Sequence, residues 1–395
     1  MRHDPHCSAK KDTIVVAQTE PKDFFKQRRS APEIKEEIFL KFLPVWAETL
    51  FATQSPLEKV LLVDASTGTA ETAEGEMPGA AKVLKTIFGT AGGRYDLDKV
   101  MQPYFYEASK SQAALLAQAM EELYFYPDLQ HKPVFLNTKE NLEAFQEELA
   151  QNVPAFYFLD PFGNKFSQEL WLQGVGQEKT DFMMLFEYKR LAAALGKSDD
   201  QSSLASFLGE RFSRLKAYFA KTSSAAKKET FALKTFEEAL QEKGLQTSRF
   251  RINVPGKDQS SHYLLFVSRS YLAHTRFKEL LLPYSDVQED GVPMLGANLK
   301  AVRLLVPEYS KYLEFSLVNL VEDLLQNAAE YNSMVLDKIY EKHNVGKNYC
   351  KANYQTAFEK LKEQGKITLL NPKTGQVVYK LTSACRIKFK PNGSV

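Results

Sequence analysis

Four polar residues close short apolar segments of the sequence and are candidates to act on one ligand. Asp64 closes KVLLVD, Glu107 closes PYFYE, Asn137 closes KPVFLN and Asp160 closes AFYFLD. In an open α/β sheet, ligands bind beyond the carboxyl ends of the strands, so we expect these side chains around one crevice. A lone acid after a strand is also a common turn former or helix N-cap, so the spacing of all four carries the hypothesis.

The first three of these residues have distinct expected roles if the ligand is S-adenosylmethionine. Asp64 opens the loop DASTGTA, in which Gly68 would let the backbone approach the ligand closely, and Ser66 of the same loop is a further candidate contact. Glu107 would accept hydrogen bonds from both ribose hydroxyls, since an ionised carboxylate is an acceptor only. Asn137 would meet the edge of the adenine.

The fourth residue begins a sharp turn, DPFG, and we assign Asp160, Pro161 and Phe162 as candidate catalytic residues. The turn resembles the Asp-Pro-Pro-Tyr motif of methyltransferases that modify exocyclic base amines. In that motif the acid and the following carbonyl accept hydrogen bonds from the amine, and an aromatic ring stacks on the base. Orientation supplies most of the rate, and the base is usually flipped out of its stack. Here Gly163 replaces the ring, so either Phe162 stacks or the substrate is not a base.

Five apolar segments predict the strands that position these residues, at 59–64, 103–107, 132–137, 155–160 and 181–187. They lack polar alternation and are separated by helical stretches, which is typical of a buried parallel sheet. Segments 249–254 and 262–269 then predict a hairpin. We expect an α/β fold with a Rossmann-like sheet of the class I methyltransferase type, in which five parallel strands precede a late hairpin. A dinucleotide dehydrogenase would have six parallel strands.

Three parts of the chain are expected from its composition and periodicity. Residues 1–30 are polar and expected to be flexible. Residues 31–330 form the Rossmann-like domain, with a helical insert at about 202–244. This domain begins with a helix over 33–51 that Pro44 would kink or split. Residues 331–395 form a winged helix-turn-helix domain.

The last of these parts is basic. From Asp337 to Val395 twelve Lys or Arg face four Asp or Glu, a net charge of +8, whereas the whole chain carries +2. Helices at 333–343 and 349–366, with a wing at 367–381, predict the winged helix. A basic winged helix indicates phosphate contacts, although many winged helices bind proteins instead. The candidate nucleic-acid contacts are Lys347, Asn348, Tyr349, Lys351, Asn353, Gln355, Lys373, Arg386 and Lys388, with Lys390 beyond them.

Bulk properties exclude several other classes of protein. With 395 residues, 44% hydrophobic and 25% charged, the chain has the composition of an ordinary soluble protein. Three distant cysteines without a CxxC spacing argue against a disulfide framework or zinc cluster, and the six histidines show no metal spacing. No signal peptide or membrane span is expected, which predicts a cytoplasmic protein. The sequence contains neither the Gly-x-x-x-x-Gly-Lys-Ser/Thr loop that binds nucleoside triphosphates nor the Gly-x-Ser-x-Gly nucleophile elbow of hydrolases.

Four segments together resemble the three-Cys-motif partner (TcmP) family: EIKEEIFLKFLPVWAETL, LLVDASTGTAETAEGEMPG, YFYEASKSQAALL and FYFLDPFG. The resemblance is spread over about residues 32–390 in short motifs. It implies a methyltransferase-like Rossmann-type fold, a C-terminal winged helix and a radical-SAM-like partner with a three-cysteine motif. The cofactor loop departs from the family, since Ala65 and Ala70 take glycine places and Ser66 takes an aromatic place. A methyl group at Ala70 would crowd a cofactor carboxylate.

Two functions from different classes fit these observations. The first is an S-adenosylmethionine-dependent methyltransferase acting on nucleic acid, with an exocyclic base amine as the best acceptor. The second is a non-catalytic scaffold of the same shape, which binds nucleic acid or a protein partner through its winged helix. The polar strand ends favour the first, and the two alanines of the cofactor loop favour the second.

Overall fold

The computed structural model of the protein describes residues 31–54, 56–65, 77–252, 262–297 and 313–390. Two candidate cofactor contacts, Ser66 and Gly68, lie outside the described residues, as does Ala70. The segment 1–30 that was expected to be flexible also lies outside them.

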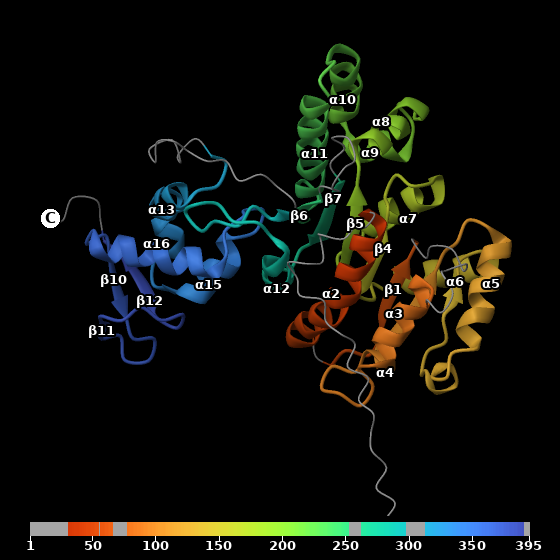
Figure 1. Ribbon diagram of the computed structural model, residues 1–395, viewed down its shortest axis with the longest axis horizontal. Coiled ribbons are helices and arrows are strands. Elements are labelled where there is room, and N and C mark those ends of the chain that lie inside the picture. Colours follow the sequence, from red (N-terminus) through yellow and green to blue (C-terminus); the bar gives the residue numbers. More distant parts are fainter. Residues whose placement is uncertain (1–30, 55, 66–76, 253–261, 298–312, 391–395) are drawn as a thin grey trace, which may run out of the picture.

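A mostly parallel sheet forms the centre of the larger domain (Figure 1). Its strand order is β3-β2-β1-β4-β5-β7-β6-β8, in which β1 to β5 are parallel and β7 runs antiparallel to both β5 and β6. The predicted fold class, with five parallel strands and a late hairpin, is therefore confirmed. The strands are β1 (Val60–Asp64), β2 (Met101–Phe105), β3 (Val134–Phe135), β4 (Ala155–Leu159), β5 (Thr180–Phe186), β6 (Gln246–Ile252), β7 (His262–Ser268) and β8 (Gly296–Ala297).

Helices cover both faces of this sheet, which explains why its strands are apolar without alternation. In β4, Phe156 and Phe158 belong to one core cluster, whereas Tyr157 and Leu159 belong to the other. Successive side chains of a strand point to opposite faces, so both faces must be buried. The helices are α2 (Ala31–Thr53), α3 (Gly79–Phe88), α4 (Leu97–Val100), α5 (Lys110–Glu121), α6 (Lys139–Ala150), α7 (Lys165–Val175), α8 (Tyr188–Lys197), α9 (Ser203–Leu208), α10 (Glu210–Lys221), α11 (Ala225–Gln241) and α12 (Tyr271–Leu281).

The first described helix, α2, packs along the middle of the sheet. The ring of Phe39 stacks on Phe158 with centroids 3.9 Å apart, and the Trp46 indole donates a hydrogen bond of 2.7 Å to Asp181 on β5. Pro44 lies inside this helix and does not split it. Tertiary packing of the apolar face on both sides of Pro44 outweighs the one backbone hydrogen bond that a proline removes.

The C-terminal unit has its own core and lies beside α12 and β6 (Figure 1). Its small sheet has the order β11-β10-β12-β9. The core includes Leu320 and Leu324 of the first of its helices, so the boundary expected at residue 331 cuts through it, and we propose a boundary before that helix. The elements are α13 (Leu317–Gln326), α14 (Ala328–Tyr331), β9 (Met334–Val335), α15 (Leu336–His343), α16 (Lys351–Glu363), β10 (Ile367–Leu370), β11 (Val377–Val378) and β12 (Arg386–Phe389).

Among the described residues, none of the helices combines the length and the apolar composition needed to cross a bilayer.

Candidate functional site

The carboxyl edge of the sheet brings the polar strand ends together at its topological switch point. The strand order changes direction between the neighbours β1 and β4, and this is where open α/β sheets bind ligands. Asp64 is the last residue of β1, only 1% exposed, and pairs in register with Phe158 of β4. Asp160 follows two residues later. The two acids therefore end adjacent strands, as the sequence predicted.

Glu107 and Asn137 lie two residues beyond the ends of β2 and β3, because both strands end two residues earlier than predicted. They are joined directly, because the Asn137 side-chain amide donates to the backbone oxygen of Glu107 at 2.5 Å. The Glu107 carboxylate accepts from the backbone N–H of Ser109, which caps α5. Glu107 therefore also acts as a turn former, which was the alternative to a ligand contact. The buried Asn137 Oδ1 has no hydrogen-bond partner among the described residues, so an acceptor is available for a donor such as an adenine amine.

The carboxylate of Asp160 is held by two cations. Lys35 of α2 contacts Oδ1 at 2.6 Å, and Arg190 of α8 contacts Oδ2 at 3.1 Å. Lys35 is only 3% exposed and its ammonium lies 4.7 Å from the centre of the Phe158 ring, so the first pair is buried against the sheet. A buried ammonium without a paired charge costs several kcal/mol. Asp160 therefore has a structural task that the sequence did not indicate.

The two residues after Asp160 do not have the geometry expected for a base amine. The Pro161 carbonyl accepts a buried hydrogen bond of 3.1 Å from the indole of Trp171. Phe162 is 9% exposed and meets the rings of Trp171, Phe186 and Phe236 edge-on. In this arrangement Phe162 is a core residue, and the expectation that it stacks on a base is not supported.

A hollow of about 830 Å³ begins immediately after this turn and shares Arg190 with Asp160. It lies between the start of α7, the face of α8 and the segment that leads into α9. Most of its lining residues are polar or charged, but apolar atoms make up about half of the lining surface, so it suits a group that has both polar and apolar parts. The lining residues are Phe162, Gly163, Asn164, Lys165, Gln168, Glu169, Arg190, Ala193, Ala194, Lys197, Ser198, Asp199, Gln201, Ser202 and Ser203.

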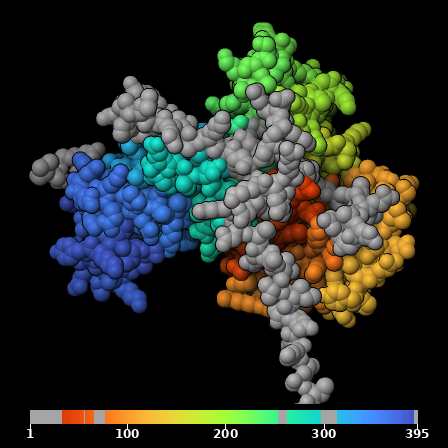
Figure 2. All heavy atoms as spheres, in the orientation of Figure 1, coloured from red at the N-terminus to blue at the C-terminus, as the bar shows by residue number. Residues whose placement is uncertain are grey.

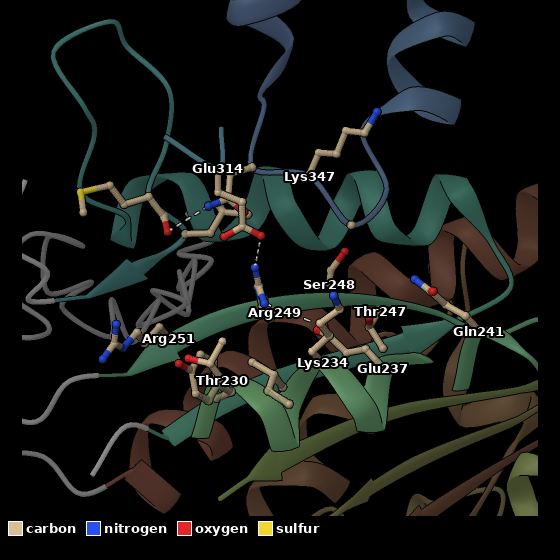
Figure 3. Close-up of a pocket in the computed structure, with 16 residues that line it drawn as sticks. Thr230, Lys234, Glu237, Gln241, Thr247, Ser248, Arg249, Arg251, Glu314 and Lys347 are labelled. Carbon is tan, nitrogen blue, oxygen red and sulfur yellow. Dashed lines mark hydrogen bonds and ion pairs between the residues drawn. The ribbon is translucent and has the colours of Figure 1, made fainter. Parts of the chain in front are cut away.

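A second hollow, of about 550 Å³, lies between the sheet domain and the C-terminal unit (Figure 3). Arg249 of β6 reaches Glu314 at 2.8 Å and lies 3.8 Å from Glu237 of α11. Burial raises the pKa of Glu237 and Arg249 opposes that shift. The central charges are thus paired with each other, and we assign no ligand to this hollow.

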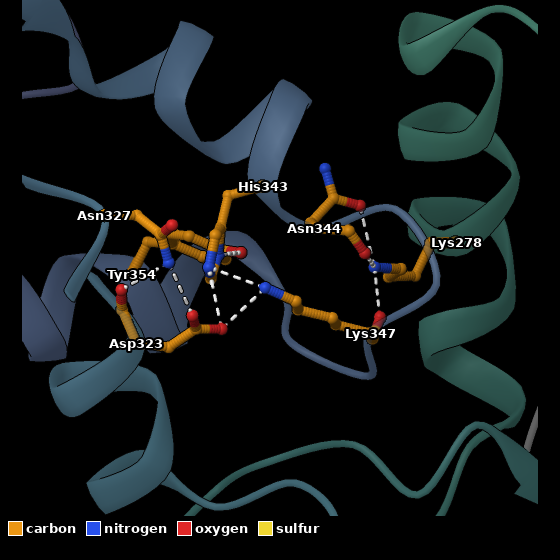
Figure 4. Close-up of polar contacts among 7 residues, drawn as sticks. All are labelled: Lys278, Asp323, Asn327, His343, Asn344, Lys347 and Tyr354. Carbon is orange, nitrogen blue, oxygen red and sulfur yellow. Dashed lines mark hydrogen bonds and ion pairs between the residues drawn. The ribbon is translucent and has the colours of Figure 1, made fainter. Parts of the chain in front are cut away.

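The turn between α15 and α16 contacts helix α12 of the sheet domain (Figure 4). Lys278 of α12 is 1% exposed, and its ammonium donates to three acceptors at short range: the backbone oxygens of Asn344 and Lys347, at 2.6 and 2.5 Å, and the Asn344 side chain, at 2.7 Å. The Tyr349 carbonyl is a fourth, at 3.3 Å. Asn344 is the C-cap of α15, where a cation meets unpaired carbonyls and the negative end of the helix dipole.

Most nucleic-acid candidates near this turn are occupied by the fold. The Lys347 ammonium lies 2.6 Å from Asp323 and 2.7 Å from His343. Tyr349 is 2% exposed, and burial raises its pKa to about 12.

Of the remaining candidates, those around the start of α16 are mostly engaged by the fold, whereas those of the wing are exposed. The side-chain amides of Asn348 and Asn353 donate to the backbone oxygens of Met294 and Gly291, in the segment that follows α12. Lys351 pairs with Asp337 at 2.8 Å, so Gln355 is the one exposed candidate of α16. By contrast, the candidates of the wing, namely Lys373, Arg386 and Lys388, together with Lys390, are all exposed.

Three cations with buried or paired roles were not predicted from the sequence: Lys35 and Arg190, which contact Asp160, and Lys278 at the domain junction. A signal existed for Lys35, which stands three and four residues before the core positions Ile38 and Phe39 and thus on the buried face of its helix. Lys278 likewise stands three residues after Thr275 and three before Leu281, which are both buried positions of α12. Their partners are far along the chain, so the pairs themselves had no local signal.

Comparison with known proteins supports the winged helix. Residues 307–374 match the GMT-like wHTH domain, which confirms that prediction for the C-terminal unit. Among solved structures, the chain is similar to magnesium protoporphyrin IX methyltransferase (ChlM) from Synechocystis PCC 6803 with bound SAH. The identity is 12%, the TM-score is 0.29, and the match covers 61% of this chain and 89% of that one. No curated protein matches the chain.

Proposed function

We propose that the protein is an S-adenosylmethionine-dependent methyltransferase whose winged helix recruits nucleic acid. The observation that carries this proposal is the gathering of Asp64, Glu107 and Asn137 at the carboxyl ends of β1, β2 and β3. The joined pair of Glu107 and Asn137 combines a partly exposed carboxylate with a buried amide oxygen that lacks a described partner. A ribose and an adenine edge need these two acceptors.

The hydrogen-bond acceptors of this site fit the chemistry of the cofactor. Glu107 would hold the ribose hydroxyls, Asn137 would accept from the adenine amine, and Asp64 would fix the start of the loop that approaches the amino-acid end. When bound, the cofactor supplies a methyl group on a positively charged sulfur. The chain's own task is then to orient an acceptor beside that methyl and to exclude water.

The acceptor end of the site is arranged differently from the base-amine motif. Both oxygens of Asp160 already contact cations, and the Pro161 carbonyl is bonded to Trp171. An exocyclic base amine as acceptor would require Arg190, which is partly exposed, to move away from Asp160. The hollow beyond Arg190 is the space into which an acceptor would enter.

Titration calorimetry of the full chain with S-adenosylmethionine tests the cofactor proposal. We expect binding by wild type and a loss of affinity of at least about tenfold in Glu107→Gln, because a hydrogen bond to a charged group is worth about 1.5–3 kcal/mol. Glu121→Gln removes an exposed acid of α5 and is the matched control. If wild type gives no detectable heat of binding at high protein concentration, the enzyme proposal is wrong.

A non-catalytic scaffold is the second candidate, and the satisfied state of Asp160 favours it. In this reading the winged helix recruits the chain to nucleic acid or to a protein, and the TcmP resemblance names a three-cysteine-motif protein as that partner. Methyl transfer to nucleic acid by wild type, lost in a folded Asp160→Asn protein, would exclude the scaffold. Cofactor binding without any transfer would support it.

A further inference from the structure

One stretch of the C-terminal unit carries positive charge without any acid. Between residues 364 and 390 the sequence has six Lys or Arg and no Asp or Glu. All six are exposed, and we call them together the wing face: Lys366, Lys373, Lys380, Arg386, Lys388 and Lys390. In the space-filling view, the end of the chain that carries them lies at the outer end of the C-terminal lobe, away from the body (Figure 2).

The central strand of the small sheet orders three of these charges in a row. Along β12, Ile387 and Phe389 are buried while Arg386 and Lys388 are exposed, and Lys390 continues the alternation. Alternate residues of a strand are about 6.8 Å apart and point to the same side. The row is therefore a straight line of cations on the solvent side of the sheet.

The neighbouring strand adds a fourth cation to the same side. The Lys390 N–H donates to the backbone oxygen of Lys366 at 2.9 Å, which places these two residues opposite each other in the antiparallel pair β10–β12. Like charges directly opposite on adjacent strands repel. The fold accepts that cost here, and an anionic partner would relieve it.

The other cations of this unit are paired, apart from the exposed Lys360 of α16. Lys338, Lys342, Lys347, Lys351 and Lys362 each lie within 2.8 Å of a carboxylate oxygen. Within the part of the chain that the structure describes, the six wing-face residues make no such pair. The positive charge of the unit is therefore concentrated on this surface and not at the helix-turn-helix turn, which faces the other domain.

We propose that the wing face binds the phosphate backbone of nucleic acid, which rests on the proposed function in naming nucleic acid as the partner. Each phosphate contact releases counterions, so binding would be strongly dependent on salt and largely independent of sequence. Tyr379, 87% exposed beside Lys380, offers a ring that can stack on an unpaired base. At the start of α16, by contrast, Lys351 and Asn353 are already engaged by Asp337 and by the Gly291 backbone oxygen.

Fluorescence anisotropy with the full chain tests this surface, using labelled mixed-sequence DNA duplex, RNA duplex and single strand over a series of salt concentrations. The test variant is Arg386→Gln/Lys388→Gln/Lys390→Gln. The control is Lys189→Gln/Lys221→Gln/Lys227→Gln, which removes the same charge from exposed positions of α8, α10 and α11. A second variant, Lys373→Gln/Lys380→Gln, changes residues outside the strands and avoids any effect on strand pairing.

We expect the triple variant to lose at least tenfold in affinity and up to about 2.7 in the slope of log K against log salt, at about 0.9 per lost phosphate contact. The double variant should lose part of both, and the control should behave like wild type. If both wing variants bind with the affinity of wild type, or if the control loses as much affinity as they do, the wing face is not the binding surface. The proposal of a nucleic-acid partner would then still hold. Wild type that binds none of the three probes would overturn both.

Discussion

The cations at the domain junction and the cations on the wing differ in whether the fold provides them with partners. At the junction with the sheet domain, Lys278 is buried among carbonyl oxygens and Lys347 is paired with Asp323. On the wing, Arg386 and Lys388 are exposed and have no acid partner among the described residues. A cation that the fold has satisfied contributes to stability, whereas a cation left in water is free to meet a ligand. The count of positive charges alone could not separate the two.

The same distinction divides the carboxyl edge of the sheet. Asp160 is satisfied by Lys35 and Arg190, while the buried oxygen of Asn137 has no described partner. The residue that looked most catalytic in the sequence is thus the one most occupied by the fold. The cofactor end of the site retains unused hydrogen-bonding capacity.

The largest expected effect is the replacement of Lys278 at the junction. Lys278→Met leaves the Asn344 and Lys347 oxygens buried without a donor, so we expect the free energy of unfolding to fall by about 4 kcal/mol. Urea unfolding measures the loss. Arg276→Met, an exposed position of the same helix, is the control and should cost under about 1 kcal/mol. Equal stability of the two variants would show that the junction does not depend on Lys278.

The junction should also be sensitive to acid. Burial lowers the pKa of His274 on α12 to about 4, and burial together with Lys347 lowers that of His343 on α15 to about 4 against the opposing effect of Asp323. Between pH 6.5 and 4 the unfolded chain then binds more protons than the folded one, so stability falls as the pH falls.

We expect a loss of about 2–3 kcal/mol for each of these histidines by pH 4. Unfolding at a series of pH values measures the slope, and His343→Gln should flatten it. A slope unchanged by this replacement would contradict the neutral, buried state of that ring.

A smaller effect is expected for the satisfied acid of the sheet edge. Asp160→Leu leaves the Lys35 ammonium buried without its closest partner, at an expected cost of about 2 kcal/mol. Lys35→Met/Asp160→Leu should recover most of that loss, since it removes both charges. If Asp160→Leu is as stable as wild type, the pair with Lys35 has no structural role. A catalytic role of Asp160 would then be favoured.

The smallest effect is expected for Lys347, the junction lysine that the sequence offered as a nucleic-acid contact. Lys347→Met should change the affinity for a DNA duplex by less than about twofold, because the ammonium is already engaged by Asp323 and His343. Anisotropy at a fixed salt concentration measures it beside the wing variant. A tenfold loss in Lys347→Met would place the interface at the turn instead.

The fold could be predicted from the sequence because its signals are local. Uninterrupted apolar segments gave the parallel strands, and helical spacing gave α2 and α16. The ends of β2 and β3 were placed two residues too late, since β3 pairs with β2 over only two residues and apolar character continues beyond that pairing. The alternation RIKFK is typical of a strand, but the predicted wing ended at residue 381 and so left out β12.

The site was only partly predictable, because its decisive contacts join distant segments. Asp160 and Lys35 are 125 residues apart, and Lys278 meets Asn344 66 residues later. No spacing rule pairs such residues. The positions of Asp64, Glu107 and Asn137 followed from strand ends alone, and for that reason they were predicted correctly as neighbours of one edge.

Hydrogen–deuterium exchange of the full chain with and without a DNA duplex tests the contrast between wing and junction most directly. We expect slower exchange in β10 and β12, at Ile367–Leu370 and Arg386–Phe389, with the turn at residues 344–350 unchanged. Protection confined to that turn and to the first half of α16, with none on the wing, would contradict it.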